Sequence, residues 1–166
     1  MSSFFITGRK EASQVLDVDV EPIQVPQPAI FIPIGSPALL IEESEARTFI
    51  RELGMKYNVE GRRPTCIINV SARWISEENN VKIMSNPRPQ TVHDFFGFAE
   101  CLYEVDYAAD GSVETAAMVA EALTSAGIAW EFDGQRGYDV GCWSPAALLF
   151  PDASVPLFQV IDQCSC

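Results

Sequence analysis

This chain of 166 residues has one histidine, and its 11 lysines and arginines are outnumbered by 23 aspartates and glutamates. The net charge of −12 argues against binding to nucleic acid, because phosphate backbones are bound by basic surfaces. It argues in the same way against binding to an anionic membrane surface. Nucleic-acid-binding and membrane-surface proteins are therefore excluded as classes.

Long hydrophobic runs are also missing. No run of about 18 apolar residues is present, so we expect no transmembrane helix, and residues 1–14 lack the apolar stretch of a secretory signal. The five cysteines are odd in number and mostly scattered, which indicates a reduced, cytoplasmic protein. Apolar residues make up 48% of the chain, enough for a folded core.

The pattern of apolar residues, prolines and glycines divides the chain into an arm and one domain. Residues 1–28 are polar or acidic and carry three prolines, so we predict an extended arm before a single domain at 29–166. We expect helices at 42–53, 113–126 and 144–150, and strands at 29–34, 65–72, 81–85, 128–132 and 155–162. Gly54 is the predicted stop of the first of these helices, Ser112 is the N-cap of the second, and Pro145 lies in the first turn of the third.

Strands and helices alternate along the domain, which predicts an α/β fold. We expect a three-layer-like sandwich around a largely parallel or mixed sheet. Loops at the carboxyl ends of such strands usually form the functional site. The segments after 29–34, 65–72 and 128–132 should therefore converge, joined by the long loop around residues 91–98.

Those segments carry a resemblance to a known family. From about Ala29 to Val160, the chain is similar to the class III extradiol ring-cleavage dioxygenases of the DOPA-dioxygenase type. Six segments occur in the family's order with similar spacing, and the family's C-terminal part is missing. The segments are "FIPIGSP", "NVSARW", "RPQTVHDFFGF", "LYEVDY", "RGYDVGCW" and "VPLFQV".

The resemblance implies that the metal ligands have been lost. The family has active-site histidines at the positions of Ile34, Arg73 and Val140, and further ones in the missing part. Non-haem iron and zinc sites need at least three nitrogen, oxygen or sulfur ligands. Ile34 and Val140 donate nothing, and Arg73 is a fixed cation that repels a metal ion. We therefore expect neither a metal nor another cofactor.

Two residues are candidate catalytic groups. His93 is the one family histidine that remains, and it is either a general acid/base or a residue that only shapes its loop. Arg73 either binds a carboxylate or enolate oxygen, or forms a salt bridge with Glu77, Glu78 or Asp139.

Further residues of these segments are candidates for binding a flat ligand, although each also has a structural interpretation. The Ser36 hydroxyl is suited to capping the following helix, Asp139 to stabilising a turn, and the aromatic residues to the core. Cys142 is interpreted as structural. The candidate substrate-binding residues are Ser36, Trp74, Asp94, Phe95, Tyr138, Asp139 and Trp143.

These observations favour a metal-independent enzyme, an isomerase, cyclase or lyase that acts on a phenolic or polyketide-like molecule in specialised metabolism. The alternative is a catalytically inactive pseudoenzyme that serves as a binding or regulatory protein. A residual metal-dependent ring-cleavage dioxygenase is less favoured. The missing part should leave apolar surface or an open sheet edge, so we also predict a homodimer or an obligate partner.

Overall fold

The computed structural model describes residues 29–32, 36–60, 62–74 and 80–161. The predicted arm at 1–28, together with Ile34, Glu77 and Glu78, lies outside the described residues. The elements in chain order are η1 (Pro37–Leu40), α1 (Glu45–Tyr57), β1 (Ile67–Val70), β2 (Val81–Met84), η2 (Glu100–Leu102), α2 (Val113–Ser125), β3 (Trp130–Asp133), α3 (Val140–Leu149) and β4 (Leu157–Val160).

The sheet is four-stranded and mixed, in the order β1-β4-β2-β3. β1 pairs with β4 in parallel and β2 with β3 in parallel, whereas β2 and β4 are antiparallel where Ile83 lies opposite Val160. The predicted α/β fold around a largely parallel or mixed sheet is therefore confirmed. β4 lies inside the sheet and all of its residues are buried, which fits a sequence that is apolar except for Gln159.

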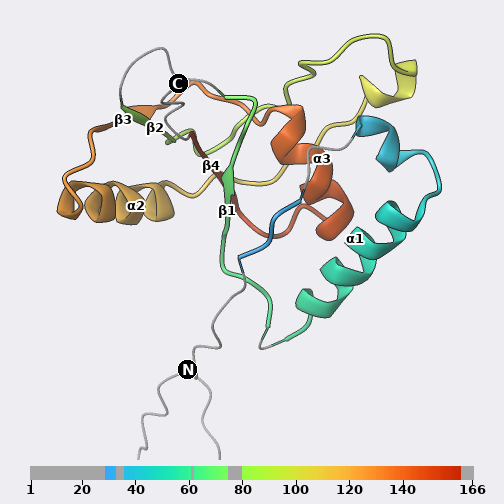
Figure 1. Cartoon of the computed structure of the whole chain (residues 1–166), viewed down its shortest axis with the longest axis horizontal. Coiled ribbons are helices and arrows are strands. Elements are labelled where there is room, and N and C mark those ends of the chain that lie inside the picture. The colour runs from blue at the N-terminus through green and yellow to red at the C-terminus, as the bar shows by residue number, and fades with distance from the viewer. Residues whose placement is uncertain (1–28, 33–35, 61, 75–79, 162–166) are drawn as a thin grey trace, which may run out of the picture.

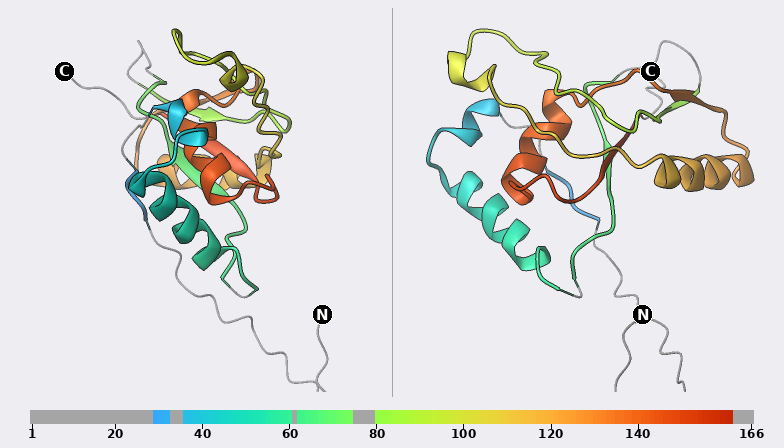
Figure 2. Two further views of the ribbon diagram at one scale, coloured as in Figure 1. Left: turned by 90° about the vertical axis from the view of Figure 1, so that its right-hand side faces the viewer. Right: turned by 180° about the vertical axis from the view of Figure 1, so that it is seen from behind.

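The helices form two groups at opposite ends of the sheet. Figure 1 shows α2 below β2 and β3, and the view from behind in Figure 2 shows α1 and α3 together on the other side of β1. The inner face of α2 carries Ala116 and Ala120, which are small enough for close packing and are buried. Within the described part of the chain, no helix is long and apolar enough to cross a bilayer.

The end signals of α2 act as the sequence predicts. The Ser112 hydroxyl accepts a hydrogen bond from the Thr115 amide at 3.1 Å and so caps the first turn. Gly127 follows the helix with φ of +71°, a conformation that a residue without Cβ adopts at little cost.

The predicted start of α3 is wrong. The helix begins at Val140 rather than at residue 144, because the Asp139 carboxylate caps it by accepting from the Cys142 amide at 3.1 Å. Pro145 consequently lies inside the helix.

Two further expectations about elements are wrong. Gly54 does not end α1, which continues to Tyr57, and an ideal Cβ on Gly54 would lie 2.0 Å from the Leu149 carbonyl oxygen. Gly54 is therefore the point where α1 and α3 approach closely. The described residues of the first predicted strand, 29–32, are not in a strand, and Phe31 is 91% exposed.

Candidate functional site

The ends of two strands and one long loop meet in a polar cluster. Ser71 and Arg73 follow β1, Asp139 follows β3, and Asp94 belongs to the loop between β2 and α2. The Ser71 hydroxyl donates to Asp139 at 2.8 Å, and the Arg73 Nε donates to Asp94 at 2.7 Å. The predicted convergence is therefore seen for the segments after 65–72 and 128–132 and for the loop around 91–98, whereas Ser36, after 29–34, bonds within its own segment.

Asp139 is the buried centre of this cluster and has no exposed surface. Its Oδ2 accepts from the Ser71 hydroxyl at 2.8 Å, from Arg136 at 2.8 Å and from the Gln159 amide at 2.7 Å. Its Oδ1 accepts the capping hydrogen bond from Cys142. These bonds compensate for the loss of water around a buried carboxylate.

Asp94 joins Arg73 to the start of α3. Its Oδ2 pairs with the Arg73 Nε, its main-chain oxygen accepts from Arg73 at 2.5 Å, and its Oδ1 accepts from the Val140 amide at 2.9 Å. Partial burial raises the pKa of Asp94, but the bonds from Arg73 and Val140 outweigh this and leave its pKa below the usual value. Among the described residues, Arg73 pairs with Asp94, whereas Asp139 pairs with Arg136.

His93 precedes Asp94 in the chain and lies in an aromatic environment. Its Nε2 is 2.9 Å from the Val105 carbonyl oxygen, which can only accept, so Nε2 carries the hydrogen in this contact. In the neutral imidazole, Nδ1 then has the free lone pair. The ring centroid is 5.7 Å from Trp143, 5.8 Å from Phe95 and 6.2 Å from Tyr103.

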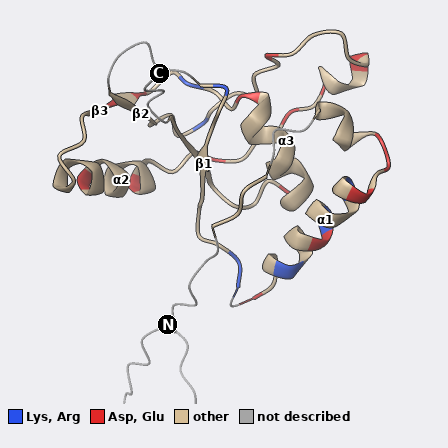
Figure 3. Cartoon of the chain, in the orientation of Figure 1, with Lys and Arg blue, Asp and Glu red and all other residues tan. Residues whose placement is uncertain are grey.

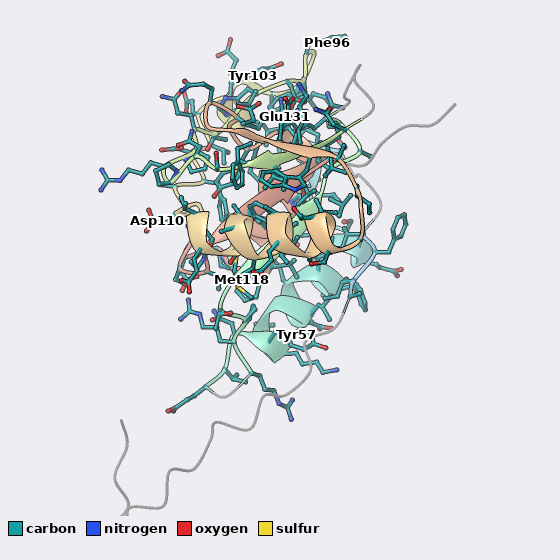
Figure 4. All side chains as sticks on the ribbon, turned by 90° about the vertical axis from the view of Figure 1, so that its left-hand side faces the viewer. Tyr57, Phe96, Tyr103, Asp110, Met118 and Glu131 are labelled. Carbon is teal, nitrogen blue, oxygen red and sulfur yellow. The ribbon has the colours of Figure 1, made fainter. Side chains whose placement is uncertain are left out.

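The aromatic candidates differ in exposure. Trp143 is fully buried and donates from its indole to the Val92 carbonyl at 3.0 Å. Trp74 is nearly buried beneath the Arg136 guanidinium, 4.9 Å from its ring centroid, in a cation–π contact. By contrast, Phe96 is 91% exposed, and Figure 4 shows it at one extremity of the molecule.

The remaining candidates have structural contacts. The Ser36 hydroxyl caps η1 by accepting from the Ala38 amide at 3.2 Å. Tyr138 is buried and donates to the Leu157 carbonyl at 2.8 Å, and burial raises the pKa of its phenol. Burial and the nearby carboxylate of Asp139 also raise the pKa of the Cys142 thiol, which keeps it protonated and unreactive. The substrate-binding roles of Ser36 and Tyr138 stay predictions.

Several members of the cluster were missed by sequence reasoning. Gln159 is a buried amide in an otherwise apolar strand, and that contrast was an available signal. Arg136 and Ser71 offered no comparable signal, because their partners lie on other elements. Tyr103 and Val105 were missed as neighbours of His93 for the same reason.

Comparison with known proteins identifies the family. Residues 41–166 match the family described as the catalytic LigB subunit of aromatic ring-opening dioxygenase. The 4,5-DOPA dioxygenase extradiol of Escherichia coli K12 is 33% identical over 133 residues, which cover 80% of this chain and 46% of that protein. The protein of that name from Beta vulgaris is 31% identical, over 80% of this chain and 49% of its own length. The chain therefore belongs to the LigB family.

More distant relatives agree with this assignment. The dioxygenase tasH of Hapsidospora irregularis is 29% identical over 76% of this chain and 40% of its own length. The crystal structure of an uncharacterized Escherichia coli K12 protein matches with a TM-score of 0.53 and 27% identity, over 72% of this chain and 41% of that one. The chain spans about half the length of the curated relatives it matches.

The residues described here do not fit a catalytic metal ion. The Arg73 guanidinium occupies the end of β1 and is held by Asp94, whose two carboxylate oxygens are both engaged. In the described ranges, no group of three or more histidine, cysteine, aspartate or glutamate side chains is placed to hold a metal. Ile34 lies outside the described residues, and Val140 has no donor atom in its side chain.

Proposed function

We propose that this chain is a metal-independent member of the LigB family that binds a flat phenolic or polyketide-like molecule and acts on it by proton transfer. The reaction class is isomerisation, cyclisation or lyase cleavage, because these reactions need an acid/base group and no oxidant. The binding surface is the aromatic group around His93, formed by Phe95 and Tyr103, and the buried Trp143 ring packs against His93.

One observation carries the proposal: His93 is fixed by Val105 at 2.9 Å among aromatic rings, next to a cation–carboxylate pair rather than a metal site. The contact with Val105 sets the tautomer, so that Nδ1 is the basic nitrogen. Aromatic walls suit a planar ligand, since ring faces and edges attract one another. Phe95 and Tyr103 are not fully buried, with ring centroids 4.7 Å apart, so a ligand can reach them from solvent.

Arg73 has a supporting role in this proposal. Its Nε and one terminal nitrogen are held by Asp94, which fixes the guanidinium near the end of β1. A cation held in this way stabilises an enolate or phenolate oxygen without having to reorganise. The Asp94 carboxylate offsets part of its charge, so its contribution is smaller than that of a metal ion.

The test is proton exchange on a panel of catechols, including DOPA, and hydroxylated polyketide aromatics. Purified protein is incubated with each compound in deuterated water, and mass spectrometry follows deuterium uptake and new products. We expect uptake or conversion without added iron, no oxygen consumption, and loss of turnover in His93→Gln. Glutamine keeps a hydrogen-bond donor for Val105 but does not titrate, so ligand affinity should survive. Oxygen consumption that depends on iron would overturn the proposal.

A second candidate function is non-catalytic binding, and the saturation of the polar cluster favours it. Both oxygens of Asp139 and both of Asp94 are already bonded within the protein, which leaves fewer groups for chemistry. In that case a panel compound quenches tryptophan fluorescence, but no deuterium is taken up. Binding that is equal in wild type and His93→Gln, without turnover in either, identifies the pseudoenzyme.

A further inference from the structure

The β1 strand has an edge that no other described strand covers. Within the described part of the chain, β1 pairs only with β4. The Ile67 amide donates to Pro156 at 2.9 Å and the Ser71 amide to Val160 at 3.1 Å, so alternate residues turn their main-chain groups towards β4. Since main-chain groups alternate along a strand, those of Ile68 and Val70 point away from the sheet.

The same two residues expose apolar side chains. Ile68 is 53% exposed and Val70 is 63% exposed, and both lie on one face of β1. Free main-chain donors and acceptors beside β-branched side chains are a template for another strand. Proteins prevent another chain from pairing with such an edge by adding a strand, by placing charged residues on it or by covering it with a helix or loop.

The chain carries a segment that fits this edge. Residues 16–21 alternate strictly, with Leu16, Val18 and Val20 apolar and the three residues between and after them acidic. This period of two is the pattern of a strand with one apolar face. Pro22 follows directly and prevents the strand from continuing.

The segment is also within reach. Eight residues, 21–28, separate Val20 from the start of the described chain at Ala29, and extended they span up to about 26 Å. Figures 1 and 2 show the blue start of the described chain near the beginning of β1. A tether of this length raises the effective concentration of the segment to the millimolar range, about 1 mM.

We propose that residues 16–20 add to the sheet as a fifth strand beside β1, so that Leu16, Val18 and Val20 extend the apolar face of Ile68 and Val70. The main-chain groups of Ile68 and Val70 are then hydrogen-bonded within one chain. The interaction is β-augmentation in cis.

Charge favours this occupant over a second copy of the chain. Figure 3 shows basic residues before and after β1, and in the sequence Arg63 and Arg73 flank this strand. A twofold pairing of β1 with the β1 of a second copy is antiparallel, so Arg63 of each chain approaches Arg73 of the other. The ion pairs of Arg63 with Asp152 and of Arg73 with Asp94 reduce this repulsion but do not turn it into an attraction. Residues 16–21 bring three carboxylates to the same edge instead.

Hydrogen exchange on the full chain tests the proposal. We expect the amides of Ile68 and Val70 to exchange slowly in wild type, independently of protein concentration. In an Asp19→Pro, Val20→Pro variant, two adjacent amides are removed, and one of them must face β1, so the exchange of Ile68 and Val70 should accelerate by about tenfold or more. Ser13→Pro, outside the alternating residues, is the matched control and should leave exchange unchanged. The β4 amides report in every sample that the sheet is folded.

Three outcomes would overturn the proposal. The first is fast exchange of Ile68 and Val70 in wild type, and the second is equal protection in the double proline variant. The third is protection that rises with protein concentration together with a doubled mass, which assigns the edge to a second copy.

Discussion

The Asp139 carboxylate accepts hydrogen bonds from four groups and holds two strand ends and the first turn of α3 together. Removing it leaves the partly buried Arg136 cation and the fully buried Gln159 amide without their acceptor. We therefore expect Asp139→Ala to lower the free energy of unfolding by about 3–5 kcal/mol. Urea denaturation followed by tryptophan fluorescence measures this loss.

Asp106 provides the matched control for this substitution. It is exposed and accepts one hydrogen bond, from the Thr91 hydroxyl at 2.9 Å. Asp106→Ala should cost no more than about 1 kcal/mol. Equal losses in the two variants would show that the Asp139 cluster does not organise the site.

The Arg73–Asp94 pair should stabilise the fold in a pH-dependent way. Because the pKa of Asp94 is lower in the folded chain than in the unfolded one, its contribution is present above the unfolded value, about 4. It is lost as the pH falls through the folded value. The pair is partly solvated, so we expect a coupling free energy of only about 1 kcal/mol in a double-mutant cycle of Arg73→Met and Asp94→Asn at pH 7.

The measurement is urea denaturation of the four proteins of the cycle at several pH values. The coupling should be constant near neutral pH and shrink below about pH 4, where the carboxylate takes up its proton. A coupling that is the same at low and neutral pH would contradict the ion pair.

Among the elements, the contact of α1 with α3 depends on one glycine. In an exposed helix interior, alanine is more favourable than glycine by about 1 kcal/mol. At Gly54 the sign should reverse, because an ideal Cβ meets the Leu149 carbonyl at 2.0 Å and its Cα at 2.7 Å. We expect Gly54→Ala to destabilise the fold by about 1–3 kcal/mol through forced separation of the helices.

Thermal unfolding followed by circular dichroism measures this effect. Ala46→Gly in the exposed first turn of α1 calibrates helix propensity in the same helix and should destabilise by at most about 1 kcal/mol. If Gly54→Ala raised the melting temperature, the close approach of α1 and α3 would be absent.

Elements with a clear local signal could be predicted from the sequence. The β4 strand follows from its apolar run, and α2 from its apolar spacing, Ser112 and Gly127. The start of α3 could not be predicted, because the signal for it is the capping carboxylate of Asp139. An aspartate at this position is equally typical of a turn. The role of Gly54 could not be predicted either, because glycine occurs both at the ends of helices and where two helices pack closely.

The site was predictable in its location but not in its pairings. The convergence of the segments that carry Arg73, Asp94 and Asp139 followed from the alternation of strands and helices. The pairing of Arg73 with Asp94 spans 21 positions and that of Gln159 with Asp139 spans 20. No local pattern in the sequence specifies contacts at such separations, so they depend on the three-dimensional arrangement.

For the whole molecule, the homodimer expected from the sequence stays a prediction. The net charge of the chain makes its dimerisation dependent on salt, which provides a test. Each chain carries −12, so two chains repel one another unless salt screens them. Exposed apolar side chains on and near α2, such as Met118 at 65% and Phe132 at 48%, supply the attraction. Apolar attraction is not weakened by sodium chloride, whereas the repulsion is.

We therefore expect the dimer fraction to rise with sodium chloride. Light scattering after size-exclusion chromatography should show the 18.3 kDa chain at low salt and low concentration, and a doubled mass at high salt and high concentration. An association held mainly by ion pairs would respond in the opposite direction, because salt weakens such pairs. A mass of one chain under all of these conditions would contradict the homodimer and leave the described domain as a monomer.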